Sequence, residues 1–144
     1  MTSPNIHPRR MARERVLEAL FAYEYNHDKP SVVINRIIEN HSSIKENLKF
    51  INALFDIVVN NKDFTDQMIQ SHLQNWEFDR IAQIDRILIK MGICEMFYIE
   101  EIPPKVSITE MVEIAKIYST DDSPVFINGI LDAIYKEYQK KEKE

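Results

Sequence analysis

Apolar residues recur every three to four positions along most of the chain, which is the spacing of amphipathic α-helices. The first such segment is expected from about Pro8 to Asn26, a short second one around Val33–Ile38, and a third from about Ile44. Strand-like alternation is almost absent, and glycine occurs only twice. The pattern therefore predicts an all-α fold.

The second half of the chain continues in the same way. The third segment either continues or breaks near Asn60-Asn61, and both possibilities stay open. A strongly apolar helix is expected to start at or near Asp79 and to reach Met96. Because its second half has little polar face, we expect this helix to be central and buried on several sides.

Two later helix starts carry local signals. Ser107 and Glu110 are spaced as a capping box, in which each side chain bonds to the other residue's backbone N–H. Ser123 can cap the last helix, with Pro124 at its first helical position. The charged tail from Lys136 onward is expected to fray.

The last helix has one residue off its buried stripe. Ile127, Ile130 and Ile134 fall on one face of a 3.6-residue wheel. Phe126 points roughly 100° away from the centre of that face. A large aromatic ring is therefore expected beside the free backbone donors of a helix N-terminus, where it could stack on a base near a bound phosphate.

Length and composition indicate one domain, residues 1–144, with residues 1–7 and 140–144 frayed. Cys94 is the only cysteine, so no internal disulfide can form, and the chain is expected to be cytoplasmic. No apolar run approaches the ~20 residues of a membrane span, and the N-terminus has no apolar secretory core. Neither a membrane anchor nor a signal peptide is expected.

The charge of the chain is unevenly distributed. Its net charge is −5, yet residues 1–15 hold four arginines and one glutamate, which leaves −8 for the remainder. Arg9, Arg10 and Arg13 project onto the same helix face as Leu17 and Leu20, so this face changes from apolar to basic along its length. We expect the basic end to overhang the core and reach phosphates. The alternative is a solvated helix end with internal ion pairs.

Residue patterns for catalysis are missing. Two separated glycines cannot build a phosphate-binding loop. The four histidines lack metal-ligand spacing with one another or with Cys94, so neither a metal nor a cofactor is expected. Cys94 lies in an apolar segment and reads as a buried, inert thiol. The pattern favours a binding protein over an enzyme.

Several segments resemble one family. Phe126–Asp132 reads Phe-Ile-Asn-Gly-Ile-Leu-Asp and resembles the closing helix of the NusB transcription-antitermination proteins. Further segments resemble that family in the same order. They are the basic start with Ala19–Phe21, the stretch from Trp76 to Met96, and the segments Ile102–Glu110 and Ile114–Lys116. The resemblance covers nearly the whole chain.

The resemblance implies a fold of two perpendicular three-helix bundles and a function without catalysis. Proteins of this family bind boxA-type single-stranded RNA together with NusE, a small-subunit ribosomal protein. They act within a complex of RNA polymerase and other Nus factors, and promote processive transcription of ribosomal RNA operons. A homodimer is also possible, which would have to open if it covered the arginine face.

The resemblance also implies roles for single residues. Arg9, Arg10 and Arg13 match the RNA-contacting helix start, Phe126 matches an RNA-stacking aromatic, and Asp122 matches an acidic position beside the RNA. Phe21 and Asp85 match residues at the surface shared with NusE. For Phe21 the alternative is plain core packing, and for Asp85 it is a surface ion pair with a neighbour such as Arg86.

The chain departs from the family pattern at two places. Pro124 and Val125 stand where a basic residue often precedes the phenylalanine, and Thr109 replaces a usual asparagine. The first change removes a phosphate contact, so RNA affinity is expected to depend more on the arginines or on NusE. Two other functions stay open: a helical adaptor without RNA binding, and the NusB-like domain of ribosomal RNA cytosine methyltransferases.

Overall fold

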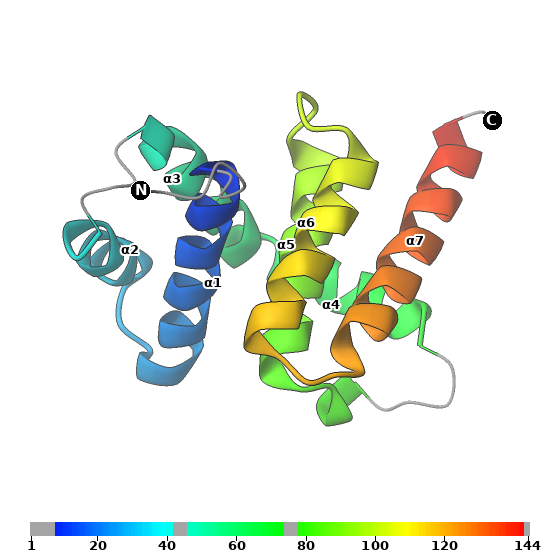
Figure 1. Cartoon of the computed structure of the whole chain (residues 1–144), viewed down its shortest axis with the longest axis horizontal. Helices are drawn as coiled ribbons and strands as arrows, with labels where there is room; N and C mark the ends of the chain where they lie inside the picture. Colours follow the sequence, from blue (N-terminus) through cyan, green and yellow to red (C-terminus); the bar gives the residue numbers. More distant parts are fainter. Residues whose placement is uncertain (1–7, 42–45, 74–77, 143–144) are drawn as a thin grey trace. The chain divides into compact units, whose positions relative to one another are not determined.

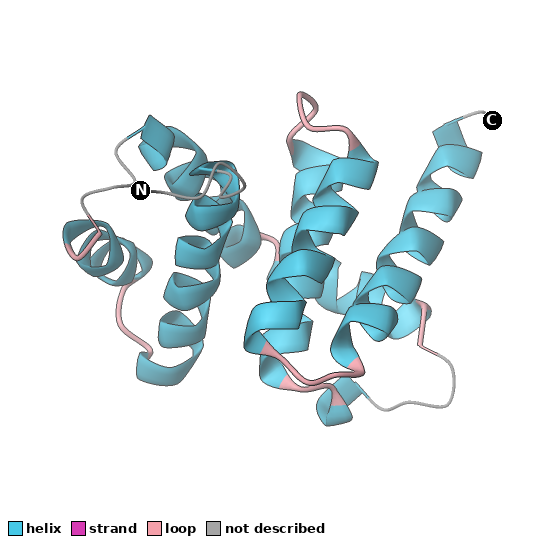
Figure 2. Cartoon of the chain, in the orientation of Figure 1, coloured by secondary structure: helices cyan, strands magenta, loops and turns pink. Residues whose placement is uncertain are grey.

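The computed structural model describes residues 8–41, 46–73 and 78–142 of the chain. Throughout these ranges the regular structure is helical, as Figure 2 shows. The predicted all-α fold class is thereby confirmed. Ile44 and Trp76, on which two of the expectations above depended, lie outside the described residues. Within them, no helix combines the length and apolar character that a membrane span requires.

The chain divides into two compact units, which are described separately. The N-terminal unit, residues 1–60, contains α1 (Pro8–Asn26), α2 (Pro30–Glu39) and α3 (Leu48–Asn60), drawn from blue to blue-green in Figure 1. Each pair of these helices is in contact. The core between them includes Val16 on α1, Val33 on α2 and Phe55 on α3, all nearly or fully buried.

The C-terminal unit, residues 61–144, contains α4 (Lys62–Ser71), the short 3₁₀ helix η2 (Phe78–Arg80), α5 (Gln83–Tyr98), α6 (Pro104–Tyr118) and α7 (Ser123–Glu142). Helices α5, α6 and α7 pack against one another, and α4 packs on α5. In the described part of the unit, α5, α6 and α7 form the expected three-helix bundle, and α4 is a further helix packed on α5. As predicted, the middle of α5 is buried on all sides, from Ile87 to Met96.

Helix boundaries follow local chemistry. Helix α1 has the predicted bounds, and it ends where His27 takes the left-handed conformation with φ 58°. The open question at Asn60-Asn61 is settled as a break, since α4 starts anew at Lys62. Helix α5 starts at Gln83, four residues later than expected, because η2 and a bend at Ile81 precede it.

The predicted capping box is wrong. Helix α6 starts at Pro104, so Ser107 lies inside the helix and is fully buried. Its hydroxyl donates to the carboxylate of Glu95 on α5, with Ser107 Oγ 2.8 Å from Glu95 Oε1. The Ser107 hydroxyl therefore links α6 to α5 and does not cap the start of α6. The charged tail, expected to fray from Lys136, continues as helix to Glu142.

The two glycines lie in contrasting surroundings, which gives a first prediction. A Cβ on Gly92 would lie 2.8 Å from Cδ1 of the fully buried Leu131, whereas a Cβ on Gly129 would meet nothing within 4 Å. We expect Gly129→Ala to raise the free energy of unfolding by about 0.5–1 kcal/mol through helix propensity. Gly92→Ala should lower it by about 1 kcal/mol, because overpacking outweighs the same gain. Urea denaturation of both variants tests this, and stabilisation by Gly92→Ala would contradict it.

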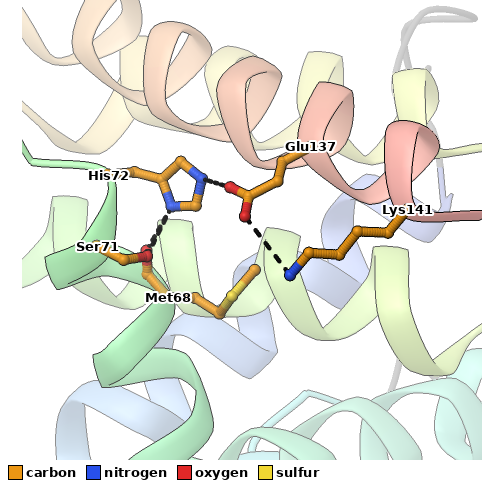
Figure 3. A network of polar contacts seen from close by, with 5 residues as sticks. All are labelled: Met68, Ser71, His72, Glu137 and Lys141. Carbon is orange, nitrogen blue, oxygen red and sulfur yellow. Dashed lines mark hydrogen bonds and ion pairs between the residues drawn. The ribbon is translucent and has the colours of Figure 1, made fainter.

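A polar network joins the end of α4 to α7 (Figure 3). Nδ1 of His72 lies 2.8 Å from the carbonyl oxygen of Met68, which can only accept, so Nδ1 carries a proton. Nε2 lies 2.5 Å from Glu137 Oε2, and Lys141 approaches the other carboxylate oxygen at 3.6 Å. The hydrogen bond and charge of His72 hold the pKa of Glu137 below its ordinary value of 4.5.

This network predicts a pH dependence. Because the pKa of Glu137 is lower in the folded state, its stabilising effect is complete above pH 4.5 and is lost as the pH falls through the folded-state pKa. Glu137→Gln should therefore cost more stability above pH 4.5 than below it, with the cost falling as the pH drops through the folded-state pKa. Thermal unfolding across this range measures it. In a His72→Gln background, the effect of Glu137→Gln should be much smaller; an unchanged effect would rule out the network as its cause.

Candidate nucleic-acid interface

The basic start of α1 packs against α3. The Arg9 guanidinium lies 4.3 Å from the centroid of the Phe50 ring, and that of Arg13 lies 5.3 Å from it. Arg9 Nε also donates to Asn47 Oδ1 at 3.3 Å. Two arginines one helical turn apart therefore contact the same aromatic ring. The attraction between each cationic guanidinium and the ring quadrupole helps to hold both guanidinium groups in place.

This packing corrects the expected overhang. Arg13 is only 2% exposed, so it belongs to the core rather than to a projecting helix end. Arg9 and Arg10 are partly exposed, and Arg10 has contacts of its own. The structure therefore leaves Arg9 and Arg10 more accessible to a phosphate than Arg13. RNA contact by any of the three stays a prediction.

An aromatic pair lies further along α1. Phe21 is 40% exposed and Tyr25, one turn later, is 77% exposed. The alternative of plain core packing for Phe21 is therefore wrong. Residues four apart lie on the same helix face, so the two side chains form one exposed apolar surface on the N-terminal unit. The sequence reasoning missed Tyr25, although the spacing from Phe21 was visible.

The start of α7 presents the second group of candidates, in the C-terminal unit. Ile127, Ile130 and Ile134 are buried as predicted, whereas Phe126 is only partly buried. Asp122, just before the helix, is exposed, and its carbonyl oxygen accepts the backbone N–H of Phe126 at 3.3 Å. The off-stripe direction of Phe126 agrees with its partial burial.

Asp85, in the first turn of α5, is buried, and its place at a surface shared with NusE stays a prediction. The residue is 7% exposed, so the alternative of a surface ion pair with Arg86 is wrong. Its Oδ1 accepts the hydroxyl of Ser119 at 2.5 Å, and its Oδ2 accepts the hydroxyl of Ser123 at 2.7 Å. Ser123 therefore bonds to Asp85 rather than capping α7 as predicted. No sequence signal pointed to these serines as partners of a residue more than 30 positions away.

The remaining chemistry is sparse. Burial raises the pKa of the Cys94 thiol to about 12, so this fully buried residue is the inert thiol that was predicted. In the part of the chain that the structure describes, no three His, Cys, Asp or Glu residues gather as metal ligands. The candidate residues divide between the units, with the arginines and Phe21 in one and Asp85, Asp122 and Phe126 in the other.

These features define a class: an all-α binding protein with arginines at the start of its first helix and an aromatic residue at the start of its last. Comparison with known proteins identifies the family. The NusB family model matches residues 10–136, and the chain belongs to the NusB family.

Individual relatives agree. The chain is 43% identical over 134 residues to the transcription antitermination protein NusB of Chloroherpeton thalassium, a match that covers 92% of this chain and 64% of that relative. A solved structure of T. maritima NusB has a TM-score of 0.82 at 30% identity, covering 95% of this chain and 94% of the other. A crystal structure of NusB and NusE in complex with double-stranded RNA has a TM-score of 0.81 at 25% identity, covering 91% and 98%.

Proposed function

We propose that this protein is a transcription antitermination factor that binds boxA-type single-stranded RNA together with NusE and has no catalytic activity. The observation that carries the proposal is the family match over residues 10–136, which includes every candidate contact except Arg9. A related NusB has been crystallised with both NusE and RNA, which supports the two partners. We further propose that the complex includes RNA polymerase and other Nus factors, and that the protein acts in the cytoplasm.

The RNA contacts are proposed to come from both units. Arg9 and Arg10 would neutralise phosphates, while Arg13 would act through Phe50 by holding the start of α1 in place. Phe126 would stack on a base, because its ring lies off the buried stripe of α7. Pro124 and Val125 add no charge beside it, so a single-stranded site of few phosphates and modest affinity is expected.

The surface for NusE is proposed to include the exposed pair Phe21 and Tyr25. Exposed aromatic side chains are common anchors in protein interfaces, since they bury a large area at small entropic cost. A homodimer through the same exposed surface is an alternative use of it. Sedimentation of the protein with and without NusE separates the two, because NusE should dissociate a dimer that uses this surface.

An in vitro transcription assay tests the function. RNA polymerase with NusE and the other Nus factors should read through a terminator more often when the protein is added to a boxA template. A template with scrambled boxA is the matched control and should show no gain. Equal read-through on both templates would favour the adaptor without RNA binding, and no gain on either would overturn the proposal.

Asp122→Asn gives a prediction within this function. The exposed carboxylate before α7 favours the helix N-terminus but repels an approaching phosphate. The variant should bind boxA RNA more tightly at low salt, while its free energy of unfolding falls by about 0.3–1 kcal/mol. Titration of the RNA with the wild-type protein and with the Asp122→Asn variant, at low and at high salt, measures the change in affinity. Unchanged or weaker binding at low salt would remove the idea.

A further inference from the structure

One carboxylate joins both ends of the connection between α6 and α7. Ser119 directly follows α6, and Ser123 is the first residue of α7. Their hydroxyls donate to the two different oxygens of Asp85, in the first turn of α5, at 2.5 and 2.7 Å. Asp85 is 7% exposed and Ser123 is 1% exposed, so these bonds are largely shielded from water.

The direction of each proton follows from this arrangement. Each serine hydroxyl has a single proton, and both protons point to the carboxylate. Thr120 Oγ1, 2.9 Å from Ser123 Oγ, must therefore donate to Ser123. Ser123 N–H donates to the Thr120 carbonyl oxygen at 3.1 Å, which closes the turn. Ser119 Oγ and Ser123 Oγ also lie 2.8 Å apart, and with both serine protons on Asp85 this contact has no proton of its own. Asp85 is the final acceptor of the cluster.

Apolar packing alone does not set this geometry. The contacts among α5, α6 and α7 hold the helices together, but burial of apolar surface is non-directional and leaves sliding and rotation weakly restrained. Hydrogen bonds of fixed length to one rigid carboxylate restrain both. Phe126 lies one turn beyond Ser123, at the border between buried and exposed. A small rotation of α7 would therefore change how much of the Phe126 ring is exposed to solvent.

We propose that Asp85 is a positioning residue that clamps the α6–α7 connection and thereby sets the presentation of Asp122 and Phe126, without touching RNA or NusE. The proposal rests on the proposed function for its consequence in RNA binding. It replaces the expectation that Asp85 is itself a contact at the surface shared with NusE, because both of its carboxylate oxygens are already engaged inside the unit.

A double-mutant cycle with Phe126 tests the proposal. Asp85→Ala should weaken RNA binding by about 10-fold, the scale of one misplaced base stack. In a Phe126→Ala background the same change should weaken binding by less than about 2-fold, since its effect passes through the missing ring. Asp85→Asn keeps one acceptor and offers an N–H₂ donor to the second hydroxyl, so it should stay within about 3-fold of wild type.

Further measurements distinguish a clamp from a direct contact and from simple unfolding. NusE binding in the absence of RNA should be unchanged by Asp85→Ala; its loss, with RNA affinity retained, would make Asp85 a partner contact. An Asp85→Ala effect that persists undiminished in the Phe126→Ala background would also overturn the clamp. If Asp85→Ala does not fold, Ser119→Ala removes only one of the two bonds and takes its place in the cycle.

Amide hydrogen exchange tests the proposed clamp in the absence of RNA. Asp85→Ala should reduce protection of the amides from Ser119 to Phe126 by at least about 10-fold, whereas Asp85→Asn should retain it. Unchanged amide protection in the Asp85→Ala variant would overturn the clamp, whether or not the variant binds RNA. If wild type binds no RNA but protection falls as expected, the proposed function fails while the clamp stands.

Discussion

An Arg10→Ala/Phe126→Ala variant is expected to bind boxA-type RNA about 100-fold more weakly than wild type. Stacking of one base on an aromatic ring contributes about 1–3 kcal/mol, and one phosphate contact adds electrostatic attraction. Each substitution is therefore expected to weaken binding by about 10-fold, and the two together by about 100-fold. Both residues are partly exposed, as a direct contact with RNA requires. Fluorescence anisotropy with a labelled RNA, at a temperature where both proteins are folded, measures the loss.

A charge-matched control separates contact from general electrostatics. Arg36 on α2 is exposed and pairs with Asp28 at 3.6 Å, so Arg36→Ala removes the same charge from the same unit. It should change RNA affinity by less than about 3-fold. The double variant should also flatten the salt dependence of log affinity by about 0.7, the value of one single-strand phosphate. Equal losses in the double variant and the control would contradict a defined RNA face.

The second large effect concerns stability. Glu95 and Ser107 are both fully buried and bonded to each other at 2.8 Å. Ser107→Ala should lower the free energy of unfolding by about 2 kcal/mol, because the buried carboxylate loses a donor. Glu95→Ala should cost about 3 kcal/mol, since it leaves the hydroxyl unpaired and opens a cavity. Guanidinium denaturation of the two variants measures both costs.

Two controls belong to this experiment. Glu95→Gln keeps an oxygen that can accept from Ser107 and should cost less than Glu95→Ala. Thr109→Ala, an exposed change on the same helix, should stay within about 0.5 kcal/mol of wild type. A cost for Ser107→Ala no larger than that for Thr109→Ala would show that the buried bond contributes little to stability.

Much of the fold could be predicted from the sequence because helical periodicity is a local signal. The bounds of α1 follow from Pro8 and from the polar loop after Asn26. The start of α5 was misplaced by four residues because η2 has the same short-range spacing as a helical turn. The capping-box pattern at Ser107 failed because the same spacing also suits a buried serine that bonds to another helix.

The candidate site was less predictable. The off-stripe direction of Phe126 follows from the wheel, and its partial burial agrees. The burial of Arg13 could not be foreseen, since its partner Phe50 lies on another helix and charge alone suggested exposure. The two serines on Asp85 were hidden for the same reason: local sequence reports which face a residue occupies, but not which distant side chain meets it there.

The affinity of the wild-type protein for a boxA-type single-stranded RNA, with and without saturating NusE, tests the central claim most directly. We expect measurable binding that NusE strengthens, that a scrambled RNA loses, and that exceeds binding to the duplex of the same sequence. By linkage, the RNA should strengthen NusE binding by the same factor. No binding of RNA in either condition, with NusE still held, would contradict the account and leave a protein-binding adaptor of the same fold.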